Sequence, residues 1–132
     1  MDEREALSML ATALPGAGDD AAVLDETVLS TDMLHASTDF PAGTTRYTAG
    51  WRSVGASLSD IAAMGATATA AVAAYGAPAL DEDEIEAYVR GAREVCDAVG
   101  ARYVGGDLDD HDEFTVATTV LGRTETPLPR DG

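Results

Sequence analysis

The segment from Asp81 to Gly100 constrains the fold most strongly, because its pattern predicts a single amphipathic helix. Acidic residues fill the first turn, as the helix dipole prefers, and Gly100 ends the helix. The apolar residues recur at helical spacing and form one stripe, made of Ile85, Tyr88, Val89, Ala92, Val95, Cys96 and Val99. Such a stripe must be buried against a second layer, which the rest of the chain has to supply.

The other segments predict that layer. Helical spacing recurs over residues 3–14 and again from about residue 51 to 64, whereas residues 35–48 are rich in Thr, Ser, Gly and Pro and predict a loop. Extended runs are expected at residues 21–25, 27–33, 67–75, 101–107 and 114–121, with the first two forming a hairpin. We therefore expect a two-layer α/β (α+β) domain with a mostly antiparallel or mixed four-stranded sheet flanked by helices.

The charge of the chain excludes several classes of function. The 132 residues carry a formal net charge of −16, and all eight basic residues are arginine. Without lysine there is no P-loop lysine, no protein-kinase lysine and no Schiff base. Binding of nucleic acid through a basic face is not expected, because counterion release needs clustered Lys and Arg.

The single Cys96 forbids an internal disulfide and a thiolate zinc cluster, and we expect it to be buried.

The same charge predicts a halophilic protein. Self-repulsion destabilises the compact state at low ionic strength, whereas in molar salt the Debye length falls to about 3 Å and the repulsion is screened. We expect the unfolding temperature to rise steeply between dilute buffer and molar KCl. A protein that stays folded and active in dilute buffer would contradict this prediction.

No targeting or membrane segment is expected. No apolar run approaches the roughly 20 residues needed to span a bilayer, and the N-terminus is acidic where a signal peptide is basic. The sequence therefore predicts a cytoplasmic protein without a membrane partner.

Three common functional motifs are excluded. "GAGDDA" matches a dinucleotide-binding turn in letters, but it follows a helix and opens a strand, the reverse of what that turn requires. "DLDDHDE" begins like a calcium loop, yet Asp112 and Thr118 stand where the loop needs glycine and glutamate. No G-x-S-x-G elbow is present, and His35 and His111 have no neighbouring partner that marks a general base.

Four segments share an aspartate next to Gly, Ser or Thr at the edge of an expected element: Asp20, Asp32, Asp60 and Asp107. If the fold brings these carboxylates together, they need a counterion, because two unit charges about 5 Å apart repel by roughly 3 kcal/mol at an effective dielectric near 20. Oxygen ligands without Cys or His select Mg²⁺ or Ca²⁺, and Mg²⁺ is the ion usually shared with substrate phosphates. An acidic chain can thus bind ATP through magnesium. The alternative is solvated acidic surface.

The segments "GDDAAVL", "LSTDML", "LSDIAAMGA" and "VGGD", in this order and at these separations, resemble the N-terminal domain of thiamine-monophosphate kinase. That family belongs to the superfamily of aminoimidazole ribonucleotide synthetase, and the resemblance runs from about Glu5 to Gly132. It implies direct transfer of the γ-phosphoryl of ATP to thiamine monophosphate. It also implies a homodimer in which two sheets pair into a barrel.

The resemblance implies roles for individual residues. Asp32, Asp60 and Asp107 would act in catalysis through magnesium, and Asp39 would contact the substrate. Gly106, Asp107 and Arg130 would bind ATP, while Asp19 would shape the turn before Asp20. The implied magnesium ligands are Asp20, Ser30, Thr31, Asp32, Asp60 and Asp107.

The match has departures. Asp39 stands where the family has a histidine associated with the substrate, and Arg52 and Ser57 replace a lysine and an asparagine. Residues 1–122 would form the domain and residues 123–132 a linker toward a second domain, without which we expect dimerisation but no turnover. Two alternatives are a related ATP-dependent synthetase, which "GDDAA" argues against, and a non-catalytic dimerisation module. Magnesium binding that is lost in Asp32→Asn would argue against the latter.

Overall fold

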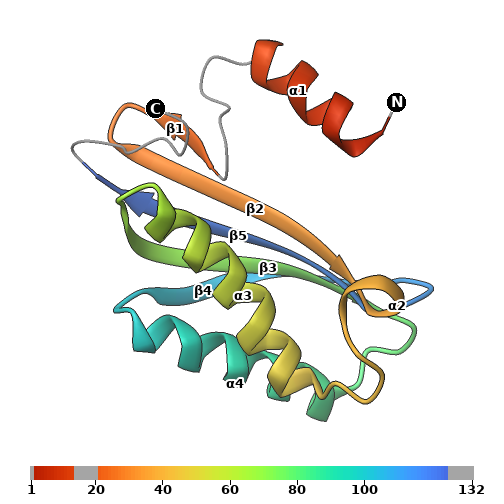
Figure 1. Ribbon diagram of the computed structural model, residues 1–132. Helices are drawn as coiled ribbons and strands as arrows, with labels where there is room; N and C mark the ends of the chain where they lie inside the picture. Colours follow the sequence, from red (N-terminus) through yellow and green to blue (C-terminus); the bar gives the residue numbers. More distant parts are fainter. Residues whose placement is uncertain (1, 14–20, 125–132) are drawn as a thin grey trace.

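The structure is a computed structural model that describes residues 2–13 and 21–124 (Figure 1). In chain order the elements are α1 (Glu3–Ala13), β1 (Ala22–Leu24), β2 (Thr27–His35), α2 (Ala36–Asp39), α3 (Arg46–Ala63), β3 (Thr67–Ala77), α4 (Glu82–Ala98), β4 (Arg102–Asp110) and β5 (Thr115–Arg123). This confirms the predicted mixed α/β class and the predicted helix over most of residues 81–100.

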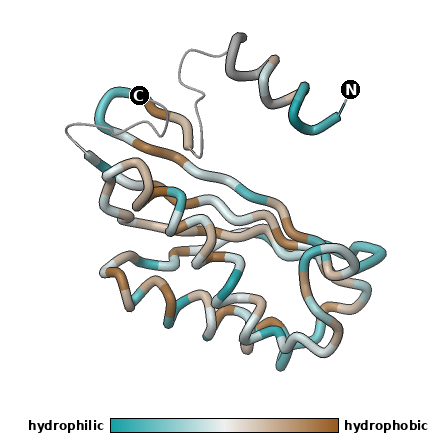
Figure 2. The backbone as a smooth tube through the Cα atoms, viewed as in Figure 1, coloured by the Kyte–Doolittle hydropathy of each residue, from teal (hydrophilic) through white to brown (hydrophobic). Residues whose placement is uncertain are grey.

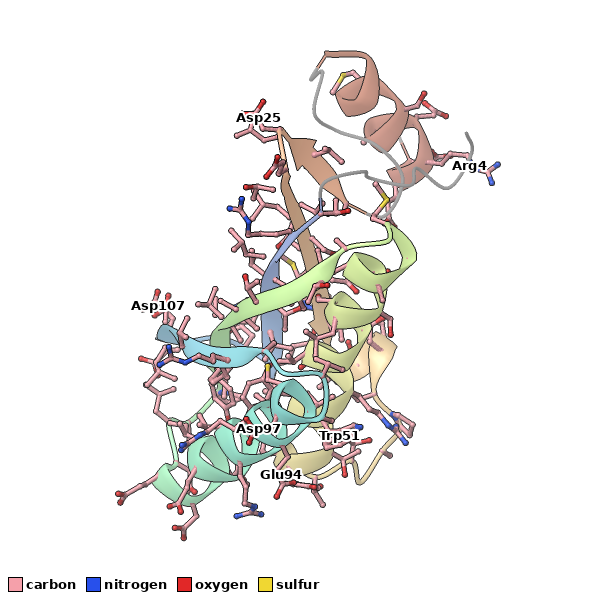
Figure 3. All side chains as sticks on the ribbon, turned by 90° about the vertical axis from the view of Figure 1, so that its left-hand side faces the viewer. Arg4, Asp25, Trp51, Glu94, Asp97 and Asp107 are labelled. Atoms are coloured by element: carbon pink, nitrogen blue, oxygen red, sulfur yellow. The ribbon has the colours of Figure 1, made fainter. Side chains whose placement is uncertain are left out.

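The strands form one mixed sheet in the order β1-β2-β5-β3-β4. β3 and β4 run parallel and are connected through α4, while the other neighbouring strands are antiparallel. Figures 1 and 3 show α3 and α4 on one face of this sheet. Within the described part of the chain, no helix covers the opposite face. The sheet therefore has a helix-covered face and an uncovered face.

Two sequence predictions need correction. The sheet has five strands and not four, because the three-residue β1 pairs with β2. Part of the region predicted as a loop is helical, since it contains α2 and the first turn of α3. The Thr45 side chain accepts a hydrogen bond from the Thr48 backbone N–H and so caps α3 five residues before the predicted start. Because the composition of residues 35–48 is typical of a loop, the sequence pattern did not indicate that Thr45 caps a helix.

The core lies between the helices and the sheet. β5 shows why it forms there: Val116, Thr118 and Val120 alternate along the strand and are fully or almost fully buried. α4 contributes its apolar stripe, and Figure 2 shows it as alternating hydrophilic and hydrophobic bands. Cys96 is buried as predicted, and burial raises the pKa of its thiol to about 11.

Helices α3 and α4 approach each other closely at two glycines. A Cβ placed on Gly50 would lie 2.1 Å from the Tyr88 carbonyl oxygen, and one on Gly91 would lie 2.1 Å from the Tyr47 carbonyl oxygen. No side chain fits at either position without moving a backbone. The crossing of the two helices therefore depends on glycine, despite its low helix propensity.

Buried hydroxyls beneath the helices are paired with one another. Ser57 Oγ and Thr118 Oγ1 are 2.6 Å apart, and Ser53 Oγ lies 2.8 Å from Tyr88 Oη. These bonds offset the cost of burying polar groups and fix α3 over β5.

In the described residues, no helix is both long enough and apolar enough to cross a membrane.

Candidate magnesium and nucleotide sites

Ser30, Asp32 and Asp60 lie on the helix-covered side of β2. Alternation along β2 directs Ser30 and Asp32 to that face, about 6.7 Å apart along the strand. The last turns of α3 bring Asp60 over the strand, where the Ser30 hydroxyl donates to Asp60 Oδ2 at 3.3 Å. Ser30 is buried and both carboxylates are half-buried. We refer to these three residues as the acidic pair site.

Asp107 does not join the acidic pair site within one chain. Asp32 is opposite Thr118 on β5, which is opposite Ala73 on β3, which in turn is opposite Gly106 on β4. Because neighbouring strands lie about 4.8 Å apart, this row separates Asp32 from Gly106 by about 14 Å. Asp107 comes one residue later, and Figure 3 shows its side chain pointing away from the helices.

The other predicted magnesium ligands have mixed positions. The Thr31 side chain lies on the uncovered face, where its Oγ1 accepts a hydrogen bond from Thr119 Oγ1 at 3.1 Å. The Thr31 hydroxyl therefore lies on the opposite face of β2 from the Ser30 hydroxyl. Asp20, its neighbour Asp19, and Arg130 lie outside the described residues. In residues 2–13 and 21–124, no three His, Cys, Asp or Glu side chains form a group that could hold a metal ion.

The predicted nucleotide residues line a cavity of about 410 Å³ between β4 and α4. Gly106 must be glycine, since a Cβ there would lie 1.8 Å from the Ala73 carbonyl oxygen. Aromatic side chains of Tyr88 and Tyr103 also line the cavity, and burial raises the pKa of both phenols so that they stay neutral. The Arg93 side chain supplies a positive charge at this cavity. An apolar, aromatic cavity with exposed glycine backbone suits a flat heterocycle.

The predicted substrate residue Asp39 ends the short helix α2. Its Oδ2 accepts a hydrogen bond from the His35 backbone N–H at 2.7 Å and one from the Thr38 hydroxyl at 3.1 Å. The backbone bond is the main reason that the pKa of Asp39 is lowered. The carboxylate is exposed, so one of its faces stays open to a ligand.

Glu113 holds the same segment from the other side. Its Oε2 accepts the Ser37 backbone N–H at 3.0 Å, and its Oε1 lies 3.9 Å from His35 Nδ1. Hydrogen bonds from the side chain and the backbone of Ser37 lower the pKa of Glu113. The segment that carries Asp39 is thus tied down by two exposed carboxylates.

This predicts a pH dependence. Because folding lowers both carboxyl pKa values, the stabilisation is complete above the ordinary values of 3.8 for Asp39 and 4.5 for Glu113 and is lost as the pH falls through the lowered values. In NMR titrations, we expect the His35 and Ser37 amide resonances to shift with midpoints below 3.8 and 4.5, respectively. The His35 transition should vanish in Asp39→Asn. Midpoints at or above those values would contradict the prediction.

The comparisons with known proteins bear on this geometry. Residues 18–124 match the family described as AIR synthase related protein, N-terminal domain. The chain belongs to that family. All four predicted aspartates fall inside the matched range, and Arg130 falls outside it.

Curated relatives are named thiamine-monophosphate kinase. The one from Halobacterium salinarum is 67% identical over 132 residues, which is 100% of this chain and 46% of the relative. The one from Methanospirillum hungatei JF-1 is 43% identical over 141 residues, which is 100% of this chain and 48% of the relative. The chain thus spans about half the length of these relatives.

A solved structure shares the fold. AaThiL complexed with AMPPCP and TMP superposes with a TM-score of 0.87 at 23% identity, over 98% of this chain and 44% of that one. At this identity the likeness concerns the fold alone. It confirms that the five-stranded sheet with helices on one face is an established architecture.

Sequence reasoning missed two parts of the site. The cavity between β4 and α4 was not predicted, although the resemblance implied that Gly106 in its lining contacts the nucleotide. The ring cluster around Phe114, with Arg46 stacked on it, was also missed, since its members are far apart in the sequence. Only the tertiary fold brings these residues together.

Proposed function

We propose that this chain is the N-terminal half of a thiamine-monophosphate kinase, a transferase of thiamine biosynthesis that transfers the γ-phosphoryl of ATP to thiamine monophosphate. The observation that carries the proposal is the contact between Ser30 and Asp60, with Asp32 on the same face. Ser30 and Asp60, which are 30 residues apart in sequence, are in contact, and both belong to the motifs that predicted a metal site.

The relatives support the same activity. Those from Halobacterium salinarum and Methanospirillum hungatei carry the kinase name, and both match this chain over its whole length. AaThiL, which shares the fold, has been solved with the ATP analogue AMPPCP and with TMP. ATP and thiamine monophosphate are therefore the proposed ligands.

The proposed domain covers residues 1–122 and the proposed linker residues 123–132. β5 ends at Arg123 and the family match ends at residue 124, close to this boundary. The relatives are about twice as long as this chain, so the remaining half would supply further contacts to the substrates. By itself, this half would bind nucleotide without turnover.

The acidic pair site fits a magnesium ion. Asp32 and Asp60 offer carboxylate oxygens and Ser30 a hydroxyl, and these are the hard ligands that Mg²⁺ takes. Both carboxylates are half-buried, so their mutual repulsion is less screened than on the surface. When bound, the metal would supply neutralisation of phosphate charge. Asp20 and Thr31 stay predicted ligands.

The residues of the chain would act by positioning. Phosphoryl transfer needs alignment and charge stabilisation more than a covalent nucleophile. Ser30 holds the Asp60 carboxylate in place, and Asp39 presents an exposed, ionised carboxylate to a substrate whose thiazolium ring is cationic. Arg130 would clamp phosphates as a bidentate fork.

The nucleotide cavity and the acidic pair site both lie on the helix-covered face of the sheet, and in the described residues the opposite face is free for a second copy. Within one chain, the paired residues from β2 to β4 separate Asp32 from Gly106 by about 14 Å. The uncovered face of the sheet exposes Leu29, Met33 and Leu121, which suits burial against a second copy. A homodimer would thus bury the uncovered faces of two sheets against each other.

The test is a transfer assay on the protein with its complete natural sequence, in molar KCl. With γ-labelled ATP, magnesium and thiamine monophosphate, we expect label in thiamine diphosphate. Turnover of formylglycinamidine ribonucleotide with no transfer to thiamine monophosphate would instead support a related synthetase. Absence of any magnesium-dependent ATP binding would support a non-catalytic module.

A further inference from the structure

We propose that Arg46 is a positioning residue that holds the substrate segment, residues 36–44, through the ring of Phe114. The proposal rests on the proposed function for its purpose, but its structural half stands on contacts within this chain. Arg46 is the first residue of α3, and only the capping residue Thr45 separates it from the substrate segment.

The placement of Arg46 is unfavourable for its own helix. The N-terminus of a helix carries partial positive charge, so a cation there is repelled. The first turn of α3 contains no acidic residue that would compensate. A tertiary role therefore has to account for an arginine at this position.

Three contacts hold the Arg46 guanidinium, from β3, from α4 and from the connection between β4 and β5. Its Cζ lies 3.9 Å from the centroid of the Phe114 ring, its Nε donates to Tyr75 Oη at 3.0 Å, and its Nη2 lies 3.3 Å from Glu84 Oε2. The side chain is 22% exposed, so this cation–π contact is largely shielded from water. Arginine suits this arrangement because its planar fork can stack and donate at once.

Phe114 contacts the substrate segment, so the contact that fixes the Phe114 ring also restrains that segment. The Phe40 ring lies 5.7 Å from the Phe114 ring, and the Ala36 backbone N–H donates to the Phe114 carbonyl at 2.9 Å. The first residue of the segment and Phe40 at its middle thus both contact Phe114, whose ring is stacked against Arg46. The segment also lines a cavity of about 210 Å³ with Arg46 and Phe114, so it is not packed solidly against the core.

A segment above a cavity needs an anchor to keep one conformation. Asp39 lies in the middle of this segment, and its carboxylate can meet a ligand reproducibly only if the backbone is held. Loss of the Arg46 stack would free Phe114 to move and would loosen Ala36 and Phe40 together. The expected consequence is weaker binding of the substrate. A smaller effect is expected at the nucleotide cavity, because Tyr75 and Tyr88 line that cavity and pack against Phe114.

Arg46→Met keeps much of the aliphatic stem and removes the fork. Arg90→Met is the matched control, because the Arg90 guanidinium also stacks on a ring, that of Tyr47 at 5.2 Å, but touches no part of the substrate segment. Arg46→Lys keeps the charge, and it replaces Arg46→Met in both measurements if the Met variant does not fold. All variants are studied in the protein with its complete sequence.

The first readout is amide hydrogen exchange without ligands. We expect Arg46→Met to speed exchange at Ala36 at least about 10-fold, with Val116 and Val120 unchanged, and Arg90→Met to change none of them. The second is kinetic: the KM for thiamine monophosphate should rise about 10-fold, while the KM for ATP should rise clearly less and kcat stay within about twofold.

Unchanged exchange at Ala36 would overturn the proposal, and so would faster exchange with an unchanged KM for thiamine monophosphate. Equal losses in both KM values would indicate general destabilisation and would also overturn it. If the wild-type protein transfers nothing to thiamine monophosphate, the proposed function fails, and the exchange result still decides whether Arg46 holds the segment.

Discussion

Asp60→Asn is expected to lower the rate of ATP-dependent phosphorylation of thiamine monophosphate about 10³-fold, because it removes one of two carboxylates that would hold magnesium. The Ser30 hydroxyl would keep a partner in the amide oxygen, so the fold should survive. Initial rates at saturating ATP and magnesium, together with an unfolding curve in molar KCl, measure both effects.

Asp25→Asn is the matched control for charge. Asp25 lies in the turn between β1 and β2 with φ of 54°, a conformation that asparagine tolerates well. It is exposed, and Figure 3 shows it far from Asp107. We expect the activity of the Asp25→Asn variant to stay within about twofold of wild type. Equal losses in both variants would mean that net charge, and not a metal site, controls the rate.

Mixing two inactive variants tests whether the site is shared. If Asp60 and Asp107 of one site come from different copies, an equal mixture of Asp60→Asn and Asp107→Asn chains should regain about a quarter of wild-type activity after subunit exchange. If both residues serve one site within a single chain, the mixture should stay inactive.

Gly50→Ala is expected to destabilise the fold by at least about 3 kcal/mol, because the new Cβ would lie 2.1 Å from the Tyr88 carbonyl oxygen. The atom in the way belongs to the backbone of α4, so relief requires the two helices to move apart. That movement would also disturb the buried bond between Ser53 and Tyr88. Denaturant unfolding at constant molar salt measures the loss.

Gly55→Ala in the same helix is the control. Its Cβ would lie 3.5 Å from Val95 Cγ2, an ordinary contact, so the gain in helix propensity should stabilise the fold by about 0.5–1 kcal/mol. Opposite signs for the two substitutions would confirm the tight crossing at Gly50. Equal small effects would show that α3 and α4 are not in backbone contact.

The sequence predicts single elements well where periodicity is strong. The apolar stripe of α4 and the alternation of β5 gave bounds within two residues of those observed. The start of α3 was missed because Thr45 caps it within a loop-like composition. The expected hairpin of residues 21–25 and 27–33 is confirmed by the antiparallel pairing of β1 with β2, whereas the expected number of four strands is wrong.

The candidate site was only partly predictable, for a physical reason. Alternation along one strand places Ser30 and Asp32 on one face, and this can be read locally. The separation of Asp107 from Asp32 depends on the order of strands in the sheet, which no local pattern encodes. Arg46 was missed for the same reason, since its partners Tyr75, Glu84 and Phe114 come from other elements.

A crystal structure of the protein grown with Mn²⁺ and AMPPCP tests the magnesium site most directly, since manganese gives an anomalous signal. We predict an anomalous peak within coordination distance of both the Asp32 and Asp60 carboxylates, with the nucleotide in the cavity beside Gly106. Manganese found only among the acidic residues 109–113, with Asp32 and Asp60 in contact with water alone, would contradict the proposed site.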